Sequence, residues 1–470
     1  MRLAAALTAC LLFSPSARSA DSEVSGWLDA WLTASGYSGS ALVVRNGTVL
    51  LRKGYGQADR EAGRPFAADT VYTIGSITKP FTAAAILKLE MQGKLRVEDP
   101  IAKHLPGVPE DKRGIAIHHL LTHTAGFESD FAGDYDPVGR DEYVRRILGS
   151  KLRSVPGTAY HYANSGYSLL GAIVEIVSGQ PYETYLRDNL FVPAGMKDTG
   201  YRVPGRSVDR EAVGYDGGKR WGRLSEKPWA NDGPYWALRA NGGILSTVDD
   251  LHKWHVALER DAILSPEAKK KMFAKHVPEG PGGDSFYGYG WAISESAWGT
   301  REIGHNGGNR IFSADFRRFP DEGLVVITSS NVASVKAPRA AGALARIAHG
   351  ENVPLPPTRS AALTPLGTKP RHLVARGWID AFNTGDPAAM TVFRAKYAAP
   401  RPGGPSDEER ARMLKRMHED LGRLEVLGVT AEEDEALVVR ARGEGGQTVS
   451  LRFMFTPGEK IEGVGVEVGD

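Results

Sequence analysis

Ser76 and Lys79 form the strongest candidate pair of nucleophile and base in this 470-residue sequence. They stand three residues apart in Ser76-Ile77-Thr78-Lys79, where a loop leads into a helix-forming segment. Side chains at this spacing share one helix face, so the hydroxyl and the amine come within hydrogen-bonding reach. Backbone N–H groups at a helix N-terminus also favour an oxyanion. The same pattern fits a helix-capping serine beside a solvent-exposed lysine, and by itself it leaves both interpretations open.

Two further motifs follow along the chain. Tyr162-Ala163-Asn164 is the only Tyr-x-Asn in the sequence, and His305-Asn306-Gly307 is the only His-x-Gly. The three motifs, in this order and with the last near a strand end, resemble those of the penicillin-recognising serine hydrolases, in particular the class C β-lactamase-like branch. Segments between residues 23 and 345, such as HHLLTHTAGF and NGGILSTVDDLHKW, are similar to the same family.

The resemblance implies that Ser76 is the nucleophile, that Tyr162 acts as the general base and that Lys79 shuttles the proton. Tyrosine and lysine have unperturbed pKa values near 10 and 10.4, so the pKa of one of them must fall by roughly three units for it to act at neutral pH. A buried cation disfavours its own charge and favours a nearby phenolate, so Lys79 and Tyr162 can share this task.

The resemblance also implies a substrate-binding set. The backbone N–H groups of Ser76 and Gly308 would bind the oxyanion, and glycine at Gly307 and Gly308 allows the backbone to approach the substrate closely. Asn164 would hydrogen-bond the amide or ester of the substrate. The family uses no cofactor in this chemistry, so none is expected here.

His305 is the point where the sequence departs from the β-lactamase pattern, which typically has Lys-Thr-Gly in the third motif. A His-x-Gly motif is similar to that of some D,D-peptidases and D-aminopeptidases, and many esterases also lack the lysine. An imidazole with a pKa near 6.5 is fully charged only in acid, so recognition of a substrate carboxylate should be weaker. If His305 titrates in the site, activity should rise with an apparent pKa around 6 to 7.

The expected function is therefore that of an exported serine hydrolase that forms an acyl-enzyme on Ser76. Its substrate would be a small molecule or a peptide, either an ester or an amide containing a D-amino acid. Two alternatives stay open: a β-lactamase or D,D-peptidase acting on cell-wall peptides, and a ligand-binding or sensor protein without turnover. The sequence leaves the oligomeric state unknown.

The net charge and the spacing of the histidines argue against a nucleic-acid-binding protein and against a metal site. Beyond residue 20 the chain carries 56 basic and 56 acidic residues, because Arg2 and Arg18 account for two of the 58 basic ones. A chain without net charge has no electrostatic footprint for nucleic acid, and no such partner is expected. The histidines within 118–123 and 252–255 lack the His-Glu-x-x-His pattern, so no metal site is expected.

The first 20 residues predict a signal peptide. An apolar run from Leu3 to Phe13 is followed by small residues, which is typical of a secretory signal. The run is too short to span a bilayer, and no transmembrane segment is expected elsewhere. Cys10 lies inside the apolar run, so lipid anchoring there is not expected. The protein should be exported, to the periplasm or the medium.

The fold expected for residues 21–350 is an α/β arrangement, a mainly antiparallel sheet flanked by helices. Residues 40–52 form a hairpin around Asn46-Gly47. Three or four strands follow at 287–330, and a helical insertion spans about 100–280. This architecture is typical of the β-lactamase and transpeptidase families, and the site should lie where sheet and insertion meet.

A second unit is expected at the C-terminus. Residues 351–369 form a Pro-rich linker. Residues 370–470 then show three helical patterns, the last opened by a capping box of Ser406 and Glu409, and four β-like runs. Helices followed by strands predict a small α+β domain. It resembles accessory domains of the nuclear-transport-factor-2 type.

Overall fold

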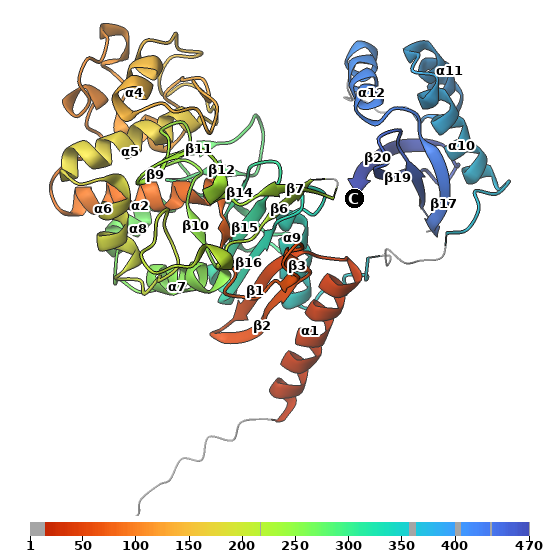
Figure 1. Ribbon diagram of the computed structural model, residues 1–470, viewed down its shortest axis with the longest axis horizontal. Helices are drawn as coiled ribbons and strands as arrows, with labels where there is room; N and C mark the ends of the chain where they lie inside the picture. Colours follow the sequence, from red (N-terminus) through yellow and green to blue (C-terminus); the bar gives the residue numbers. More distant parts are fainter. Residues whose placement is uncertain (1–14, 217, 357–362, 400–405, 433–434, 470) are drawn as a thin grey trace, which may run out of the picture.

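The computed structural model describes residues 15–216, 218–356, 363–399, 406–432 and 435–469 (Figure 1). Most of the predicted signal peptide, Cys10 included, lies outside these ranges, as do residues 357–362 of the predicted linker. Export therefore stays a prediction. Among the described residues, no helix combines the length and the apolar character that crossing a membrane requires.

An eight-stranded antiparallel sheet forms the centre of the larger unit, in the order β11-β12-β13-β14-β15-β16-β1-β2. The predicted hairpin is confirmed, with Asn46 and Gly47 at φ 49° and 76° in its two-residue turn. Strand β1 also pairs with β16, which joins the N-terminal hairpin to the later strands. The strands are β1 (Gly39–Arg45), β2 (Thr48–Tyr55), β11 (Val277–Pro278), β12 (Phe286–Tyr287), β13 (Ala292–Glu295), β14 (Arg301–Gly308), β15 (Ser313–Phe319) and β16 (Leu324–Ser330).

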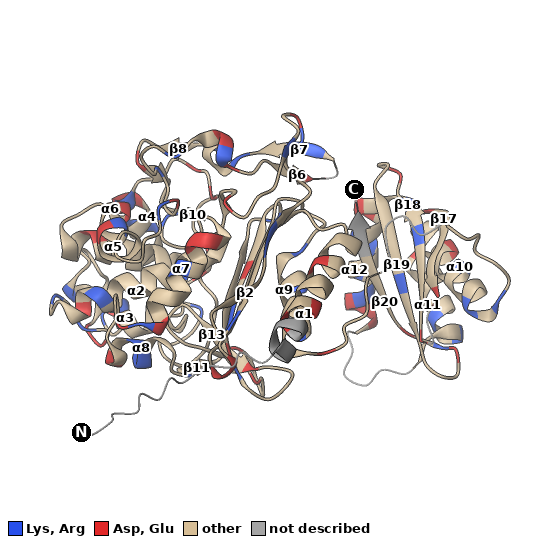
Figure 2. Ribbon diagram, turned by 90° about the horizontal axis from the view of Figure 1, so that it is seen from below, with Lys and Arg blue, Asp and Glu red and all other residues tan. Residues whose placement is uncertain are grey.

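Helices cover both faces of this sheet, as Figure 2 shows. Along β1, Val43 packs toward α1 (Pro15–Ala34) and α9 (Ala337–His349), while its neighbours Leu42 and Val44 join the core on the opposite face. Side chains alternate across a strand, so two helical layers require apolar residues at successive positions, which β1 provides. The predicted antiparallel sheet flanked by helices is confirmed.

Helix α2 (Thr78–Met91) lies between the sheet and the inserted helical region, and it is buried along nearly its whole length. Its sequence TKPFTAAAILKLEM is mostly apolar, as a helix enclosed on nearly all sides requires. The other helices of this region are α3 (Ile117–Leu121), α4 (Arg140–Leu148), α5 (Asn164–Ser178), α6 (Tyr182–Leu186), α7 (Val248–Glu259) and α8 (Pro266–Met272). The short strands of the larger unit outside the central sheet are β3 (Gln57–Asp59), β4 (Arg64–Pro65), β5 (Tyr72–Thr73), β6 (Gly214–Asp216), β7 (Lys219–Gly222), β8 (Trp229–Ala230), β9 (Gly233–Pro234) and β10 (Leu245–Ser246).

The C-terminal residues form three helices and a four-stranded antiparallel sheet in the order β17-β18-β19-β20. The expected capping box is present: the Glu409 N–H donates to Ser406 Oγ at 3.2 Å, and the Ser406 N–H donates to Glu409 Oε2 at 2.7 Å. The elements are α10 (Pro370–Asn383), α11 (Pro387–Tyr397), α12 (Asp407–Leu421), β17 (Glu425–Glu432), β18 (Ala436–Arg442), β19 (Thr448–Phe455) and β20 (Ile461–Gly469).

Truncation after Leu355 should leave a folded protein with nearly unchanged rates on small esters. The buried apolar clusters of the larger unit use residues from Leu28 to Val353, whereas the C-terminal core uses residues from Leu366 to Ile461. The measurement is circular dichroism together with kcat/KM for an ester. A folded truncated protein without activity would show that the C-terminal residues contribute to the site.

Candidate active site

Ser76 lies in a 3₁₀ turn, η1 (Gly75–Ile77), that runs directly into α2. The residue before α2 is Ile77, and no side chain caps the helix there. The Ser76 hydroxyl instead accepts a hydrogen bond from Lys79 Nζ at 3.0 Å. The spacing of the motif therefore brings nucleophile and amine together as expected, and the helix-cap interpretation is wrong.

Lys79 is fully buried, and its amine is held by three acceptors. Besides Ser76 Oγ, Nζ donates to Asn164 Oδ1 at 2.8 Å and to the backbone carbonyl of Asn241 at 2.9 Å. Desolvation lowers the Lys79 pKa to about 7, against a smaller opposing effect of Asp130 and Asp134. At neutral pH a large fraction of Lys79 is thus neutral and offers a lone pair beside the Ser76 hydroxyl.

Tyr162 precedes α5, and Lys79 Nζ lies 4.7 Å from the centroid of its ring. Although 38% of the residue is exposed, its hydroxyl is hydrogen-bonded to Ser76, and desolvation raises the Tyr162 pKa above its ordinary value. The lowered pKa expected for a phenolate base is not found. The reason is geometric: Lys79 faces the ring, a cation–π position, rather than the hydroxyl. The raised pKa keeps the Tyr162 phenol neutral at neutral pH.

Asn164, the first residue of α5, has both ends of its amide engaged. Its Oδ1 accepts from Lys79, and its Nδ2 donates to Asp130 Oδ1 at 3.1 Å. The donor expected to meet the substrate thus faces Asp130, which also accepts from Ser129 Oγ at 2.6 Å. Asn164 and Asp130 together fix the position of the Lys79 amine.

The backbone around Ser76 and Gly308 is packed too closely for side chains at two of its glycines. A Cβ on Gly307 would lie 2.6 Å from the Ser76 nitrogen, and one on Gly75, where φ is +53°, would lie 2.3 Å from the Gly308 nitrogen. Strand β14 therefore brings the two N–H groups proposed for the oxyanion onto adjacent segments. The close approach expected at Gly307 is seen, and it requires glycine there.

His305, on β14, is 7% exposed and has both ring nitrogens engaged. Nδ1 lies 2.5 Å from the Asn306 carbonyl, which can only accept, so Nδ1 carries the proton; Nε2 then accepts from the Tyr287 hydroxyl at 3.0 Å. Desolvation, and then the charge of Lys79, lower the His305 pKa to about 3. The expected titration around pH 6 to 7 is thus wrong for His305, because burial keeps the ring neutral.

His305→Lys should raise kcat/KM for carboxylate-bearing substrates relative to neutral esters, because a cation would replace a neutral ring. His305→Gln, which stays neutral, should leave the acid limb of the wild-type pH profile in place. The measurement is kcat/KM for both kinds of substrate across pH. If the acid limb disappeared in His305→Gln, the group that titrates in this limb would be His305, contrary to this expectation.

One cavity is lined by Ser76 and a second by Tyr162. One, of about 50 Å³, we call the Ser76 cavity; it is lined by Thr73, Ser76, Asp134, Tyr135, Asn164, Leu224, Leu238, Asn241, Gly242, Gly308 and Asn309. The other, of about 370 Å³, we call the Tyr162 cavity; it is lined by Tyr162, Glu279, Tyr287, Ala292, Ser294, Glu302, Gly304, His305, Asn306, Asp315 and Arg317. The nucleophile and Tyr162 thus face different spaces.

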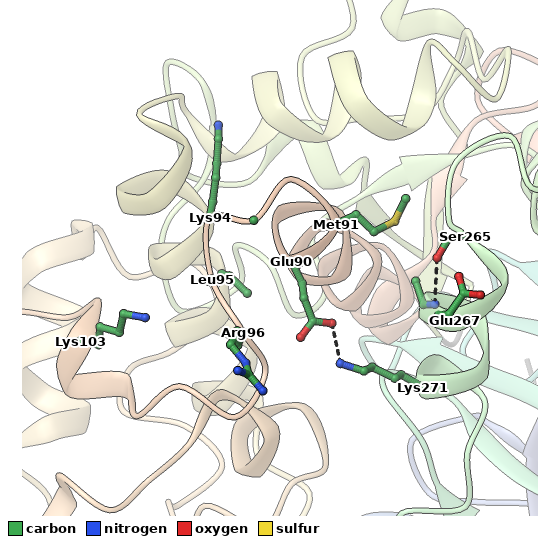
Figure 3. Close-up of a pocket in the computed structure, with 11 residues that line it drawn as sticks. Glu90, Met91, Lys94, Leu95, Arg96, Lys103, Ser265, Glu267 and Lys271 are labelled. Carbon is green, nitrogen blue, oxygen red and sulfur yellow. Dashed lines mark hydrogen bonds and ion pairs between the residues drawn. The ribbon is translucent and has the colours of Figure 1, made fainter.

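A larger hollow of about 530 Å³ lies elsewhere, at the other end of α2 (Figure 3). Glu90 on its wall follows Lys79 by 11 residues, or about 16 Å along a helix axis. The serine there, Ser265, accepts a hydrogen bond from the Ala268 N–H at 3.2 Å and so caps α8, while Glu90 pairs with Lys271 at 2.9 Å. This hollow holds no activated nucleophile. The active site is therefore placed at Ser76 by the chemistry of its residues, although the hollow is larger.

Two of the histidines weighed for a metal are hydrogen-bonded to other side chains. His118 Nδ1 is 2.8 Å from the Tyr289 hydroxyl, and His255 Nδ1 accepts from Arg318 Nε at 3.1 Å. Within the described ranges, no three His, Cys, Asp or Glu side chains converge as metal ligands would.

Sequence reasoning missed Asn241, Asp130 and Tyr287. Asn241 acts through its backbone carbonyl, which no residue type reveals. Its position depends on Ala240, whose φ of 70° is unusual for a residue with a side chain and whose carbonyl accepts from Thr82 Oγ1 at 2.7 Å. Asp130 and Tyr287 stand outside the motifs and reach the site only through folding.

Comparisons with known proteins agree with this geometry. The model of the "Beta-lactamase" family matches residues 30–350. The "Putative penicillin-binding protein PbpX" of Bacillus subtilis (strain 168) is 33% identical over 273 residues, which is 58% of this chain. The match covers 66% of that relative, just under two thirds of its length.

Solved structures share the fold. The penicillin binding protein from Bacillus halodurans has a TM-score of 0.60 and 27% identity, and the match covers 68% of this chain and 98% of that one. The D-amino acid amidase from Ochrobactrum anthropi SV3 has a TM-score of 0.58 and 23% identity over 70% of this chain and 98% of that one, a likeness of fold. The family match spans all three motifs and most of the chain, so this protein belongs to the beta-lactamase family of serine hydrolases.

Proposed function

We propose that this protein is an exported hydrolase that cleaves an ester or an amino-acid amide through an acyl-enzyme on Ser76. The observation that carries the proposal is the buried Lys79 amine, 3.0 Å from the Ser76 hydroxyl, with its pKa lowered to about 7. A serine is a weak nucleophile until a neighbouring group takes its proton. The position and the lowered pKa of Lys79 suit it to accept the Ser76 proton.

Acylation follows from the positions of the groups. Neutral Lys79 accepts the Ser76 proton while Oγ forms a bond to the substrate carbonyl carbon. The N–H groups of Ser76 and Gly308 bind the oxyanion. Tyr162, kept neutral by its raised pKa, donates its proton to the leaving group as the scissile bond breaks, and Lys79 returns the serine proton to the phenolate.

Deacylation runs the same transfers in reverse, with water in the place of the leaving group. Tyr162 passes its proton to Lys79 and takes one from the water as the water oxygen bonds to the acyl carbon; Lys79 then protonates Ser76 Oγ as the bond from Oγ to the acyl carbon breaks, and the acid product is released. The ammonium form of Lys79 is stabilised at each stage by Asn164 Oδ1 and the Asn241 carbonyl.

The neutral His305 favours this function over cell-wall D,D-peptidase or β-lactamase activity. Both of those substrates carry a carboxylate, and a neutral imidazole with both nitrogens engaged supplies no cation for it. A binding protein that only docks its ligand, without acylation, would have no need of a buried lysine held beside a serine at a free-energy cost.

The test is a panel of three substrates: p-nitrophenyl esters, D-alanyl p-nitroanilide and a chromogenic cephalosporin. We expect turnover of the ester or the anilide and little or none of the cephalosporin. Efficient cephalosporin hydrolysis would favour the β-lactamase alternative. Labelling of Ser76 without turnover of any of the three would favour the binding protein. Export is tested separately by cell fractionation and by sequencing the mature N-terminus.

A further inference from the structure

Asp134 lines the Ser76 cavity together with Asn164 and Gly308. Among the described residues, its carboxylate has no hydrogen-bond or ion-pair partner. Asp134 is half-buried, and desolvation, followed by the charge of Asp130, raises its pKa. A partly desolvated carboxylate without a partner is costly to keep in a folded protein.

The nearby Asp130 differs from Asp134 in this respect. One of its oxygens accepts from Asn164 Nδ2 at 3.1 Å and the other from Ser129 Oγ at 2.6 Å. Asp130 therefore serves to position Asn164. In the described part of the chain, no group forms a hydrogen bond or an ion pair with the Asp134 carboxylate.

The acidic side chains of the Tyr162 cavity are also satisfied. Glu279 accepts from the Tyr160 hydroxyl at 3.1 Å. Arg317 pairs with Glu302 at 3.3 Å and with Asp315 at 2.9 Å. Of the carboxylates that line either cavity within the described ranges, Asp134 alone is left for a ligand.

Each cavity can be assigned to one side of the scissile bond. In the proposed reaction Tyr162 protonates the leaving group, so the cavity that Tyr162 lines receives the leaving group. The Ser76 cavity then receives the acyl group. A cavity needs about 10 to 15 Å³ of the same kind of volume to hold one water molecule, so a volume of about 50 Å³ suits a short acyl group.

The negative charge of Asp134 in the Ser76 cavity is not paired with a positively charged side chain of the described protein. Lys79, whose charge opposes the raised pKa of Asp134, is fully buried and, when protonated, directs its three donors at Ser76, Asn164 and Asn241. His305 is neutral and lines the other cavity. An acyl group with an ammonium would find a partner in Asp134, and one with a carboxylate would be repelled.

We propose that Asp134 binds the ammonium group of a short aminoacyl substrate, which makes esters and amides of small amino acids, of glycine or alanine size, the preferred substrates. This inference rests on the proposed function for the assignment of the two cavities. It adds a specificity-determining residue that lies outside the three motifs.

A binding measurement separates this inference from the proposed catalysis. In the Ser76→Ala variant, isothermal titration calorimetry compares each enantiomer of alaninamide with isobutyramide, which carries a methyl group in place of the ammonium. We expect one enantiomer of alaninamide to bind at least tenfold more tightly than isobutyramide. Malonamate, which carries a carboxylate, should bind more weakly than isobutyramide. Adding Asp134→Asn should bring alaninamide and isobutyramide within about twofold.

Asp136→Asn is the matched control, because it removes one negative charge from the same loop outside the cavity. Asp136 Oδ2 accepts from the Gly133 N–H at 2.8 Å, and asparagine can keep that bond. The preference for alaninamide should survive in this variant. Its loss there would mean that loop charge in general, and not Asp134, sets the preference, which would overturn the proposal.

Turnover by the full chain gives the second readout. Asp134→Asn should lower the ratio of kcat/KM for alanine methyl ester to kcat/KM for methyl isobutyrate at least tenfold, a ratio in which any change of the Lys79 pKa caused by the lost charge cancels. Equal affinity for alaninamide and isobutyramide, no measurable binding of alaninamide, or a preference unchanged by Asp134→Asn would overturn the inference. Selective binding of alaninamide without hydrolysis of any ester would instead refute the proposed function and leave the inference standing.

Discussion

Ser76→Ala is expected to lower kcat/KM for esters by roughly 10⁴-fold or more, the scale seen when a catalytic nucleophile is removed. The variant should also lose labelling by a fluorophosphonate probe, since no other hydroxyl lies beside Lys79 Nζ in the described structure. The fold should persist, because the side chain is only partly buried and no backbone constraint changes. Activity assays, mass spectrometry of the adduct and circular dichroism make the measurement.

Ser265→Ala is the control for this variant. Ser265 lines the hollow at the far end of α2 and caps α8, so its loss should cost about 0.5 to 2 kcal/mol of stability and leave both activity and labelling intact. An adduct on a serine other than Ser76, or full activity of Ser76→Ala, would remove Ser76 from the role of nucleophile.

The second large effect concerns Lys79 as the base. Below its pKa of about 7 the amine is protonated and has no lone pair for the Ser76 proton, so kcat/KM should rise through pH 7 and level off above it. Lys79→Met and Lys79→Arg should both lower kcat/KM by about 10³-fold, since general-base catalysis contributes typically 10²- to 10⁴-fold. Arginine keeps the positive charge but stays protonated. An inactive Lys79→Arg variant would therefore show that Lys79 is needed as a base and not only as a positive charge.

Lys88→Met is a suitable control, because Lys88 lies on the same helix and donates to the Ile263 carbonyl at 2.8 Å, away from Ser76. Its pH profile should match the wild type. A Lys79→Arg variant that retains activity, or a wild-type profile that first rises near pH 10, would transfer the role of base from Lys79 to Tyr162.

The sequence by itself was sufficient for the local features that depend on neighbouring residues. The turn at Asn46-Gly47 and the capping box at Ser406 formed as predicted, because short-range geometry and hydrogen bonding decide them. The spacing of Ser76 and Lys79 on one helical turn likewise brought hydroxyl and amine together. The three motifs also sufficed to indicate the family and the antiparallel sheet between helices.

Only the tertiary structure decided the charge states of the site. The pKa of a side chain depends on how far the surrounding chain excludes water and where neighbouring charges lie, and neither is encoded in motif spacing. Burial lowers the pKa of Lys79 and of His305, and the position of Lys79 over the Tyr162 ring leaves the phenol neutral. Packing therefore decides that the His305 ring is neutral and that Lys79, rather than Tyr162, has the lowered pKa.

The tertiary structure also decided which groups outside the motifs reach Ser76. The Asn241 carbonyl comes from the loop before β10, and Asp134 from the loop before α4. In sequence these residues lie 165 and 58 positions from Ser76. They meet it because α2 is enclosed between the sheet and the inserted helices, and that long-range packing is a property of the whole chain rather than of any local pattern.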